Sequence, residues 1–203
     1  MGLFNRKSDA TATQTAVSAA PSADLAHLTG EYTIDPTHSE VGFAVRHAMV
    51  TTVRGQFAEY EGKLRLDGSN PANSSAEVTI KVVSVDTNQA QRDEHLRTGD
   101  FFDAATYPEM RFRSTSAEQI DGETYRMRGD LTIKDTTKPV SIDFTYNGSA
   151  TDPYGNLRVG FEGSTTVNRG DWGLTYNAAL EGGGVLISDK VKLTFDISAI
   201  KAA

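Results

Sequence analysis

The sequence contains no cysteine. This excludes disulfide bonds, thiolate metal sites, cysteine nucleophiles and a lipid-modified N-terminal cysteine. The signatures G-x-G-x-x-G, P-loop, G-x-S-x-G and H-E-x-x-H are also absent. The four histidines lie far apart along the chain and do not have metal-ligand spacing. We therefore expect no metal, no cofactor and no catalytic residues.

Positive charge is in deficit, with 20 Lys and Arg against 27 Asp and Glu and a formal net charge of -7. An overall negative field repels phosphate backbones and anionic lipid surfaces. Nucleic acid is therefore not expected as a partner.

Long apolar runs are missing as well. No segment approaches the 18 or so residues that suggest a transmembrane helix, so no transmembrane segment is expected. Residues 1–29 are rich in Thr, Ser and Ala, and they lack the apolar stretch of a signal peptide. We expect a flexible, low-complexity tail over 1–29, a single domain over 30–203, and a cytoplasmic location.

From about residue 32 onward, β-branched and aromatic residues recur with period two. The clearest run is AEVTIKV, residues 76–82, in which apolar and polar side chains alternate. Clusters of Gly, Asn, Asp and Pro separate such runs, which is typical of strands joined by turns. The apolar phase slips near Glu59 or Gly62, which predicts a bulge of the kind that barrels need to close. The pattern predicts an all-β fold.

Residues 84–110 break this pattern. The stretch has no two-residue period, and its polar, helix-tolerant part ends at Thr98-Gly99 as a helix C-terminus does. Long connections inside compact domains are uncommon and tend to be functional. We expect one or two short helical segments here, acting as a lid.

Four separated motifs resemble those of the YceI-like family: YTIDPTHSEVGFAVRH at 32–47, RDEHLRTGDFFDAATYPEMRF at 92–112, LTIKDTTKPV at 131–140 and NRGDWGLTYN at 168–177. The resemblance covers residues 32–200. It implies an extended antiparallel β-barrel like that of lipocalins, with an elongated pocket for a polyisoprenoid or another long amphiphilic lipid, including isoprenoid quinones. It also implies binding, storage or transport rather than turnover.

A barrel of about eight strands can either fill with side chains or hold one small ligand. Large apolar residues outside regular strands favour a ligand, although they could equally plug the barrel ends. The residues expected to line the pocket or its mouth are Phe43, Val45, His47, Phe57, Arg92, Leu96, Phe101, Phe102, Tyr107, Phe112, Trp172 and Leu174.

Two of these residues allow alternative interpretations. His47 shares the face of Phe43 and Val45, so it either meets a polar head such as a quinone carbonyl or is a core histidine bonded to the backbone. Arg92 either pins the long connection together with Asp93, or meets a diphosphate head at the pocket mouth together with Arg97.

Two other functions stay open at this point. An enzyme that modifies such a lipid would use His47, or Asp93 with His95, as its acid or base. A ligand-free interaction or stress protein would have a solid barrel. An exposed strand could pair two chains, so a homodimer also stays open.

Overall fold

The computed structural model describes residues 25–181 and 183–202. Most of the expected tail lies outside these residues. The described part of it includes the 3-10 helix η1 (Ala26–Leu28), whose Leu28 is buried and accepts a hydrogen bond at its carbonyl from the Tyr32 hydroxyl. The folded unit therefore includes residues just before position 30.

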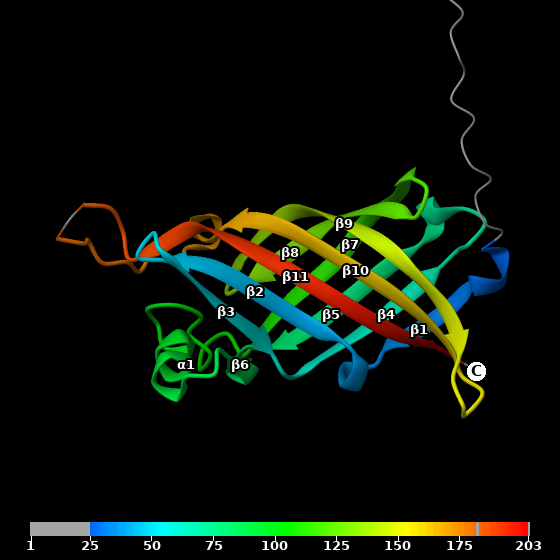
Figure 1. Cartoon of the computed structure of the whole chain (residues 1–203), viewed down its shortest axis with the longest axis horizontal. Coiled ribbons are helices and arrows are strands. Elements are labelled where there is room, and N and C mark those ends of the chain that lie inside the picture. Colours follow the sequence, from blue (N-terminus) through cyan, green and yellow to red (C-terminus); the bar gives the residue numbers. More distant parts are fainter. Residues whose placement is uncertain (1–24, 182, 203) are drawn as a thin grey trace, which may run out of the picture.

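The described residues form one antiparallel sheet that closes into an elongated barrel (Figure 1). The order of pairing is β1-β4-β5-β7-β8-β9-β10-β11-β2-β3-β6, and β1 also pairs with β11. The strands are β1 (Gly30–Ile34), β2 (Glu40–His47), β3 (Thr51–Phe57), β4 (Tyr60–Leu66), β5 (Ser75–Lys81), β6 (Val85–Asp86), β7 (Glu109–Asp121), β8 (Thr124–Ile133), β9 (Thr136–Thr151), β10 (Leu157–Asn168) and β11 (Ile187–Lys201). The predicted all-β, lipocalin-like barrel is confirmed.

The last strand, β11, closes the barrel. It pairs with β10 along one edge, and with both β1 and β2 along the other. Strands β1 and β2 are thus two parts of one long strand, which is interrupted by the 3-10 helix η2 (Pro36–His38). Pro36 supplies the fixed φ that suits a first helical position, and Asp35 caps the helix by accepting from the Thr37 N–H.

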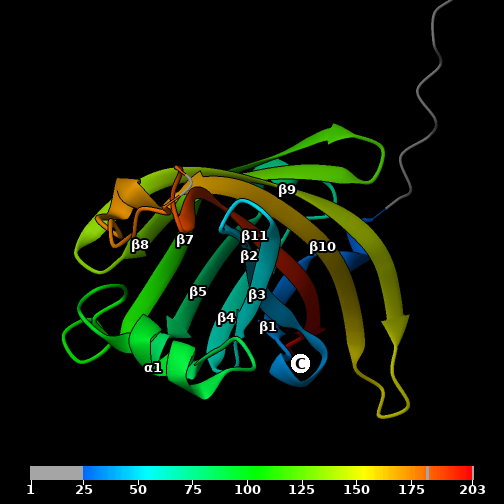
Figure 2. The same ribbon diagram turned by 60° about the vertical axis from the view of Figure 1, so that its left-hand side comes forward.

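A second long strand is also interrupted. Ala58 and Glu59 separate β3 from β4, close to the position of the predicted bulge. Before this break, Gln56 and Phe57 of β3 pair with the short strand β6, and after it β4 pairs with β5. The helix α1 (Ala90–Arg97) follows β6 and lies at this end of the barrel, as Figure 2 shows. The helix predicted within residues 84–110 is therefore present. The other short helical turns are η3 (Pro71–Asn73), η4 (Val82–Ser84) and η5 (Arg169–Trp172).

A charged network fixes the bend between β1 and β2. Arg158 donates from Nη1 to Asp35 Oδ2 at 2.6 Å and from Nε to Asp152 Oδ2 at 2.9 Å. Asp35 also accepts from the Thr37 hydroxyl at 2.7 Å and lies 2.8 Å from His38 Nδ1. The hydrogen bonds from Thr37 and from the Arg158 guanidinium hold the pKa of the Asp35 carboxyl far below its usual range.

Replacing Asp35 should therefore destabilise the barrel in a pH-dependent way. We expect Asp35→Asn to lower the free energy of unfolding by about 1.5–3 kcal/mol at pH 7, because charge-assisted hydrogen bonds are lost. The lowered pKa of Asp35 stabilises the folded state at pH values above the unfolded pKa of about 3.9. The difference in the free energy of unfolding between the wild type and Asp35→Asn should therefore shrink as the pH falls below that value. Urea denaturation between pH 3 and pH 7 measures this.

Asp143→Asn serves as the control. The Asp143 carboxylate also forms an ion pair, with Arg126, but it is 47% exposed. An exposed pair of this kind contributes at most about 1 kcal/mol. A gap for Asp35→Asn that stays constant down to pH 3 would contradict the assigned role of the Asp35 carboxylate.

Candidate functional site

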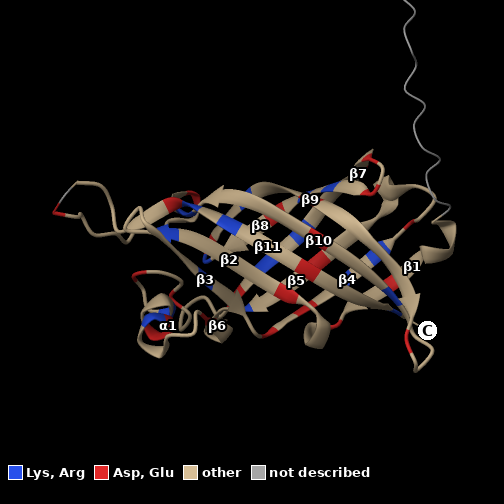
Figure 3. Ribbon diagram, in the orientation of Figure 1, with Lys and Arg blue, Asp and Glu red and all other residues tan. Residues whose placement is uncertain are grey.

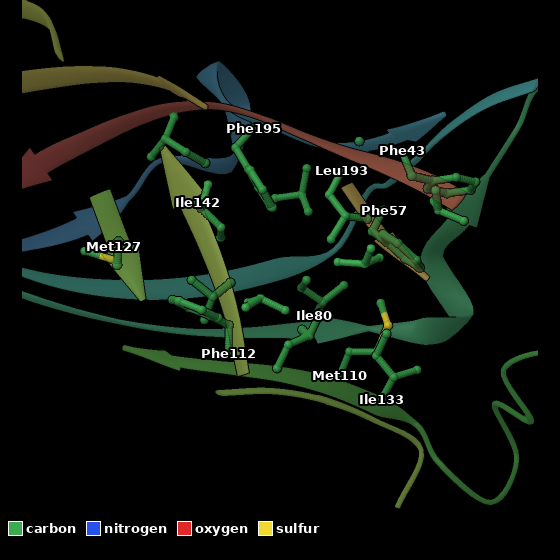
Figure 4. Close-up of a pocket in the computed structure, with 18 of the residues that line it drawn as sticks. Phe43, Phe57, Ile80, Met110, Phe112, Met127, Ile133, Ile142, Leu193 and Phe195 are labelled. Carbon is green, nitrogen blue, oxygen red and sulfur yellow. The ribbon is translucent and has the colours of Figure 1, made fainter. Parts of the chain in front are cut away.

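A cavity of about 470 Å³ runs inside the barrel. Its walls are apolar side chains from strands on every side. Figure 4 shows ten of them around a shared space: Phe43, Phe57, Ile80, Met110, Phe112, Met127, Ile133, Ile142, Leu193 and Phe195. Ligand pockets generally range from about 300 to 1,000 Å³, so this lumen is large enough for a ligand.

Glycines on the strands leave room for aromatic rings along the wall. Phe43 on β2 lies directly opposite Gly55 on β3, and a Cβ built on Gly55 would lie 2.4 Å from the Phe43 ring. Phe144 and Gly163 make the same cross-strand pair on β9 and β10, also with 2.4 Å between ring and built Cβ. These rings can lie against the wall because no side chain stands beneath them. A Cβ at these glycines would push the rings toward the lumen.

The structure brings nearly all the predicted site residues to this cavity. Those that line it are Phe43, Val45, His47, Phe57, Arg92, Leu96, Phe101, Phe102, Phe112, Trp172 and Leu174. Tyr107 is not among the described residues of the wall. The chain turns at Asp103, which has φ 51°, and the Tyr107 N–H donates to the Asp103 carbonyl at 2.8 Å. Tyr107 thus lies within a hydrogen-bonded turn, which sequence periodicity does not reveal.

Helix α1 is held in place through Thr87. Arg92 donates from Nε to the Thr87 hydroxyl at 2.7 Å and from Nη2 to the Thr87 carbonyl at 2.8 Å. The buried Asp93 accepts from the Thr87 N–H at 2.9 Å and from its hydroxyl. Arg97 donates to the carbonyls of Val83 and Val85. These contacts agree with the alternative in which Arg92 and Asp93 hold the long connection in place. They also occupy the guanidinium groups of Arg92 and Arg97, which a diphosphate head would need.

The late motif closes part of the same end of the barrel. Phe101, Leu131, Trp172 and Leu174 form a buried cluster, and Trp172 donates from Nε1 to the Leu131 carbonyl at 3.0 Å. Arg169 is 7% exposed and donates to the carbonyls of Leu174 and Tyr176 at 2.6 and 2.8 Å. Sequence reasoning missed Arg169, although its position in the motif NRGDWG was the available signal. Some of the predicted aromatics thus both plug the end and line the cavity.

A few polar side chains face the lumen without a hydrogen bond to another described residue. They include the imidazole of His47 and the hydroxyls of Ser75, Tyr125, Tyr146 and Tyr176. Burial raises the pKa of the Tyr125 hydroxyl, so it remains a neutral donor near pH 7. Tyr125 and Tyr146 alternate with outward residues on β8 and β9, and this alternation is the signal by which the sequence could have identified them.

The candidate acid–base pair does not assemble. The Asp93 carboxylate is bonded to Thr87, whereas His95 Nε2 lies 2.8 Å from Asp100 Oδ2 and the His95 ring packs against Phe101 and Tyr176. Within residues 25–181 and 183–202, no group of three or more His, Asp or Glu side chains could hold a metal ion. None of the helices described has the length and apolar character needed to cross a membrane.

The chain is similar to proteins of known sequence and structure. A UPF0312 protein of Photorhabdus laumondii is 40% identical over 147 residues, which cover 71% of this chain and 76% of that protein. The crystal structure of the Campylobacter jejuni YCEI protein matches with a TM-score of 0.68 and 31% identity, over 83% of this chain and 96% of the other.

A third likeness shows the fold alone. The structure of a polyisoprenoid binding domain from Saccharophagus degradans, implicated in plant cell wall breakdown, matches with a TM-score of 0.64 and 14% identity, over 84% of this chain and 98% of the other. The sequence profile of the YceI-like domain matches residues 32–199. The closed barrel, the order of its motifs and these matches agree, and the chain belongs to the YceI-like family.

Proposed function

We propose that this protein binds one long apolar lipid with a small uncharged head, a polyisoprenoid or an isoprenoid quinone, and stores or carries it inside the barrel. The observation that carries the proposal is the apolar lumen, which holds about 470 Å³ of space and is edged by a few polar groups that lack protein partners. The solved polyisoprenoid binding domain with the same fold supports this ligand class.

The size of the hydrophobic effect makes such binding favourable. Each methylene group moved from water into an apolar wall contributes about 0.8 kcal/mol. About ten such groups give about 8 kcal/mol before ordering costs, which is the scale of a micromolar dissociation constant. Chain burial alone can therefore hold the lipid, and the head group needs only weak polar contacts.

The charged side chains of the wall favour an uncharged head. Four arginines line the cavity, and each donates to a protein group: Arg46 to Thr52 and the Met49 carbonyl, Arg92 to Thr87, Arg126 to Asp143, and Arg169 to Leu174 and Tyr176. A phosphate head would have to break these bonds. A quinone carbonyl or an alcohol needs only a neutral donor, which Tyr125 and Tyr146 offer, and so does His47.

A carrier also fits the site better than an enzyme does. Asp93 and His95 are directed to different partners and share no hydrogen bond, so the acid–base pair that an enzyme would use is not formed. The cytoplasmic location and the homodimer stay predictions from the sequence.

The first test is native mass spectrometry of protein purified gently from its own organism. We expect one added mass per chain, which solvent extraction releases as a long-chain isoprenoid lipid. A bare protein that also fails to bind added menaquinone-4 or geranylgeraniol would overturn the proposal.

A second test narrows the lumen. Gly163→Ala should push the Phe144 ring inward and displace at least one methylene of the ligand, so menaquinone-4 should bind at least about fourfold more weakly, by fluorescence titration. Gly160→Ala is the matched control, because its Cβ would meet Asn147 at an ordinary 3.6 Å and Gly160 does not line the cavity. Equal affinities in both variants would show that the lumen does not hold the ligand.

A third test concerns the head group. His47→Leu removes a polar group from an apolar wall, and a hydrogen bond of this kind contributes about 0.5–1.5 kcal/mol. We expect menaquinone-4 to bind about 2–10-fold more weakly, while an isoprenoid hydrocarbon of similar length binds as before. An equal loss for both ligands would make His47 a wall residue only.

A further inference from the structure

An exposed apolar hairpin turn lies beside an exposed apolar residue at the base of a neighbouring loop, at the α1 end of the barrel. The turn between β2 and β3 exposes Met49 (64%) and Val50 (72%), and the loop before β11 exposes Val185 (40%). The Ala48 N–H donates to the Leu186 carbonyl at 2.7 Å, which joins the two segments. Figure 1 shows the cyan hairpin and the orange loop together at one end of the molecule. We call Met49, Val50 and Val185 the apolar tip.

The turn that carries this tip departs from the usual chemistry of turns. Ala48 and Met49 have φ of 49° and 65°, and the Val50 N–H donates to the His47 carbonyl. Consecutive left-handed residues in a hairpin turn are normally Asn, Asp or Gly, because a side chain with a larger Cβ substituent is strained there. A methionine at this place costs stability and leaves its side chain in water, so the position points to an interaction outside the barrel.

Positive charge surrounds the apolar tip, although the chain as a whole is acidic. Arg46, Arg54, Lys190 and Lys192 are all exposed on β2, β3 and β11, next to the tip. Lys192 and Arg54 both lie opposite Ala44, on the outer face of neighbouring strands. None of the four belongs to an ion pair with another described residue. Figure 3 shows Lys and Arg on β2 and β11 toward this end.

Few acidic residues lie on the outer face of β2, β3 and β11 beside this cluster, although Asp171 on η5 and Glu94 and Asp100 near α1 are exposed at the same end of the barrel. Asp189 on β11 is paired with Arg169 at 3.4 Å, and the loop over residues 173–186 contains Glu181 as its one acidic residue. The other acidic side chains of the same outer face, Glu40, Glu162 and Asp196, lie further along the strands. The cations therefore form a local patch beside the tip, and such patches act within about one Debye length regardless of net charge.

The apolar tip is continuous with the rim of the cavity. Arg46 and His47 precede the turn and line the cavity, and Leu186 and Ile187 follow Val185 and line it as well. A surface that contacted the tip would therefore also contact the end of the lumen. This arrangement suits a partner that is apolar inside and anionic at its surface, which is the chemistry of a bilayer with acidic phospholipids.

We propose that this end of the barrel docks on anionic lipid bilayers. Met49, Val50 and Val185 insert among the acyl chains, while Arg54, Lys190 and Lys192 meet the lipid phosphates; Arg46 holds the turn through the Met49 carbonyl and Thr52. The inference rests on the proposed function, because docking gives a bound isoprenoid a path between the bilayer and the lumen. The binding is peripheral and reversible, and it depends on both the apolar and the charged parts.

Vesicle flotation of the full chain tests this proposal, with phosphatidylcholine vesicles that contain 30% phosphatidylglycerol or none. We expect the protein to float with the anionic vesicles at low salt and to be released by 0.5 M NaCl. Met49→Asn with Val50→Ser should reduce flotation at least about tenfold. Asn suits the left-handed position, so this variant should keep or gain thermal stability, which separates lost docking from lost folding.

Matched controls lie at the opposite end. Tyr154→Ser removes a residue that is 89% exposed in the turn between β9 and β10, and it should not change flotation. Arg54→Gln with Lys192→Gln should reduce binding to anionic vesicles, whereas Lys63→Gln with Arg65→Gln on β4 changes the net charge equally and should not. Flotation that is absent in the wild type, or equal in the tip variant and its control, would overturn the proposal.

A parallel titration with menaquinone-4 in detergent separates the two claims. Protein that binds menaquinone-4 but does not float overturns docking alone. Protein that floats but binds neither menaquinone-4 nor geranylgeraniol overturns the lipid-carrier function and leaves docking supported. A change of molecular mass in the tip variant by light scattering, with unchanged flotation, would assign the tip to a contact between two copies and overturn membrane docking.

Discussion

The structure depends on the closure of one sheet by its last strand. The 15-residue strand β11 is hydrogen-bonded to β10 on one edge and to both β1 and β2 on the other. This pairing joins β1 and β2 to the last strand and closes the barrel, while β6 remains at an edge of the sheet. It also forces the first long strand to bend at η2, where Asp35 and Arg158 fix the bend. The side chains inside the closed barrel do not fill it, so a cavity of about 470 Å³ remains.

The sizes of the side chains that point inward then decide whether a closed barrel is solid or hollow. A barrel of about eight strands has an interior that side chains alone can fill. Here the cross-strand glycines Gly55 and Gly163 let the rings of Phe43 and Phe144 lie against the wall, and the centre stays open. The arginines of this wall donate hydrogen bonds to other groups of the protein. The outcome is an apolar space with a few neutral donors, which suits a long lipid with an uncharged head.

The sequence predicts the parts of this architecture that depend on local pattern. The period-two alternation identifies the strands, the break over residues 84–110 identifies the helix α1, and the motifs identify the family. Contacts between distant residues could not be predicted in the same way. The pairing of Phe43 with Gly55 depends on strand register, and the choice of Thr87 as the partner of both Arg92 and Asp93 depends on how the connection folds back. Tyr107 was predicted to line the pocket or its mouth but is not among the described wall residues, and the turn in which its N–H bonds to the Asp103 carbonyl is not visible in the sequence pattern. Arg169 was missed because its hydrogen bonds to the carbonyls of Leu174 and Tyr176 depend on how the late motif folds back on itself. Strand alternation does place Tyr125 and Tyr146 on inward faces, but it does not show that their hydroxyls lack a protein partner.

A crystal structure with an isoprenoid alcohol that carries a terminal bromine would show whether one lipid chain lies lengthwise in the lumen. We expect one elongated density beside Ile80, Met110 and Phe112, with a single anomalous bromine peak inside the barrel. Bromine peaks only on the outer surface, together with a lumen filled by repacked side chains or by ordered water, would contradict this expectation.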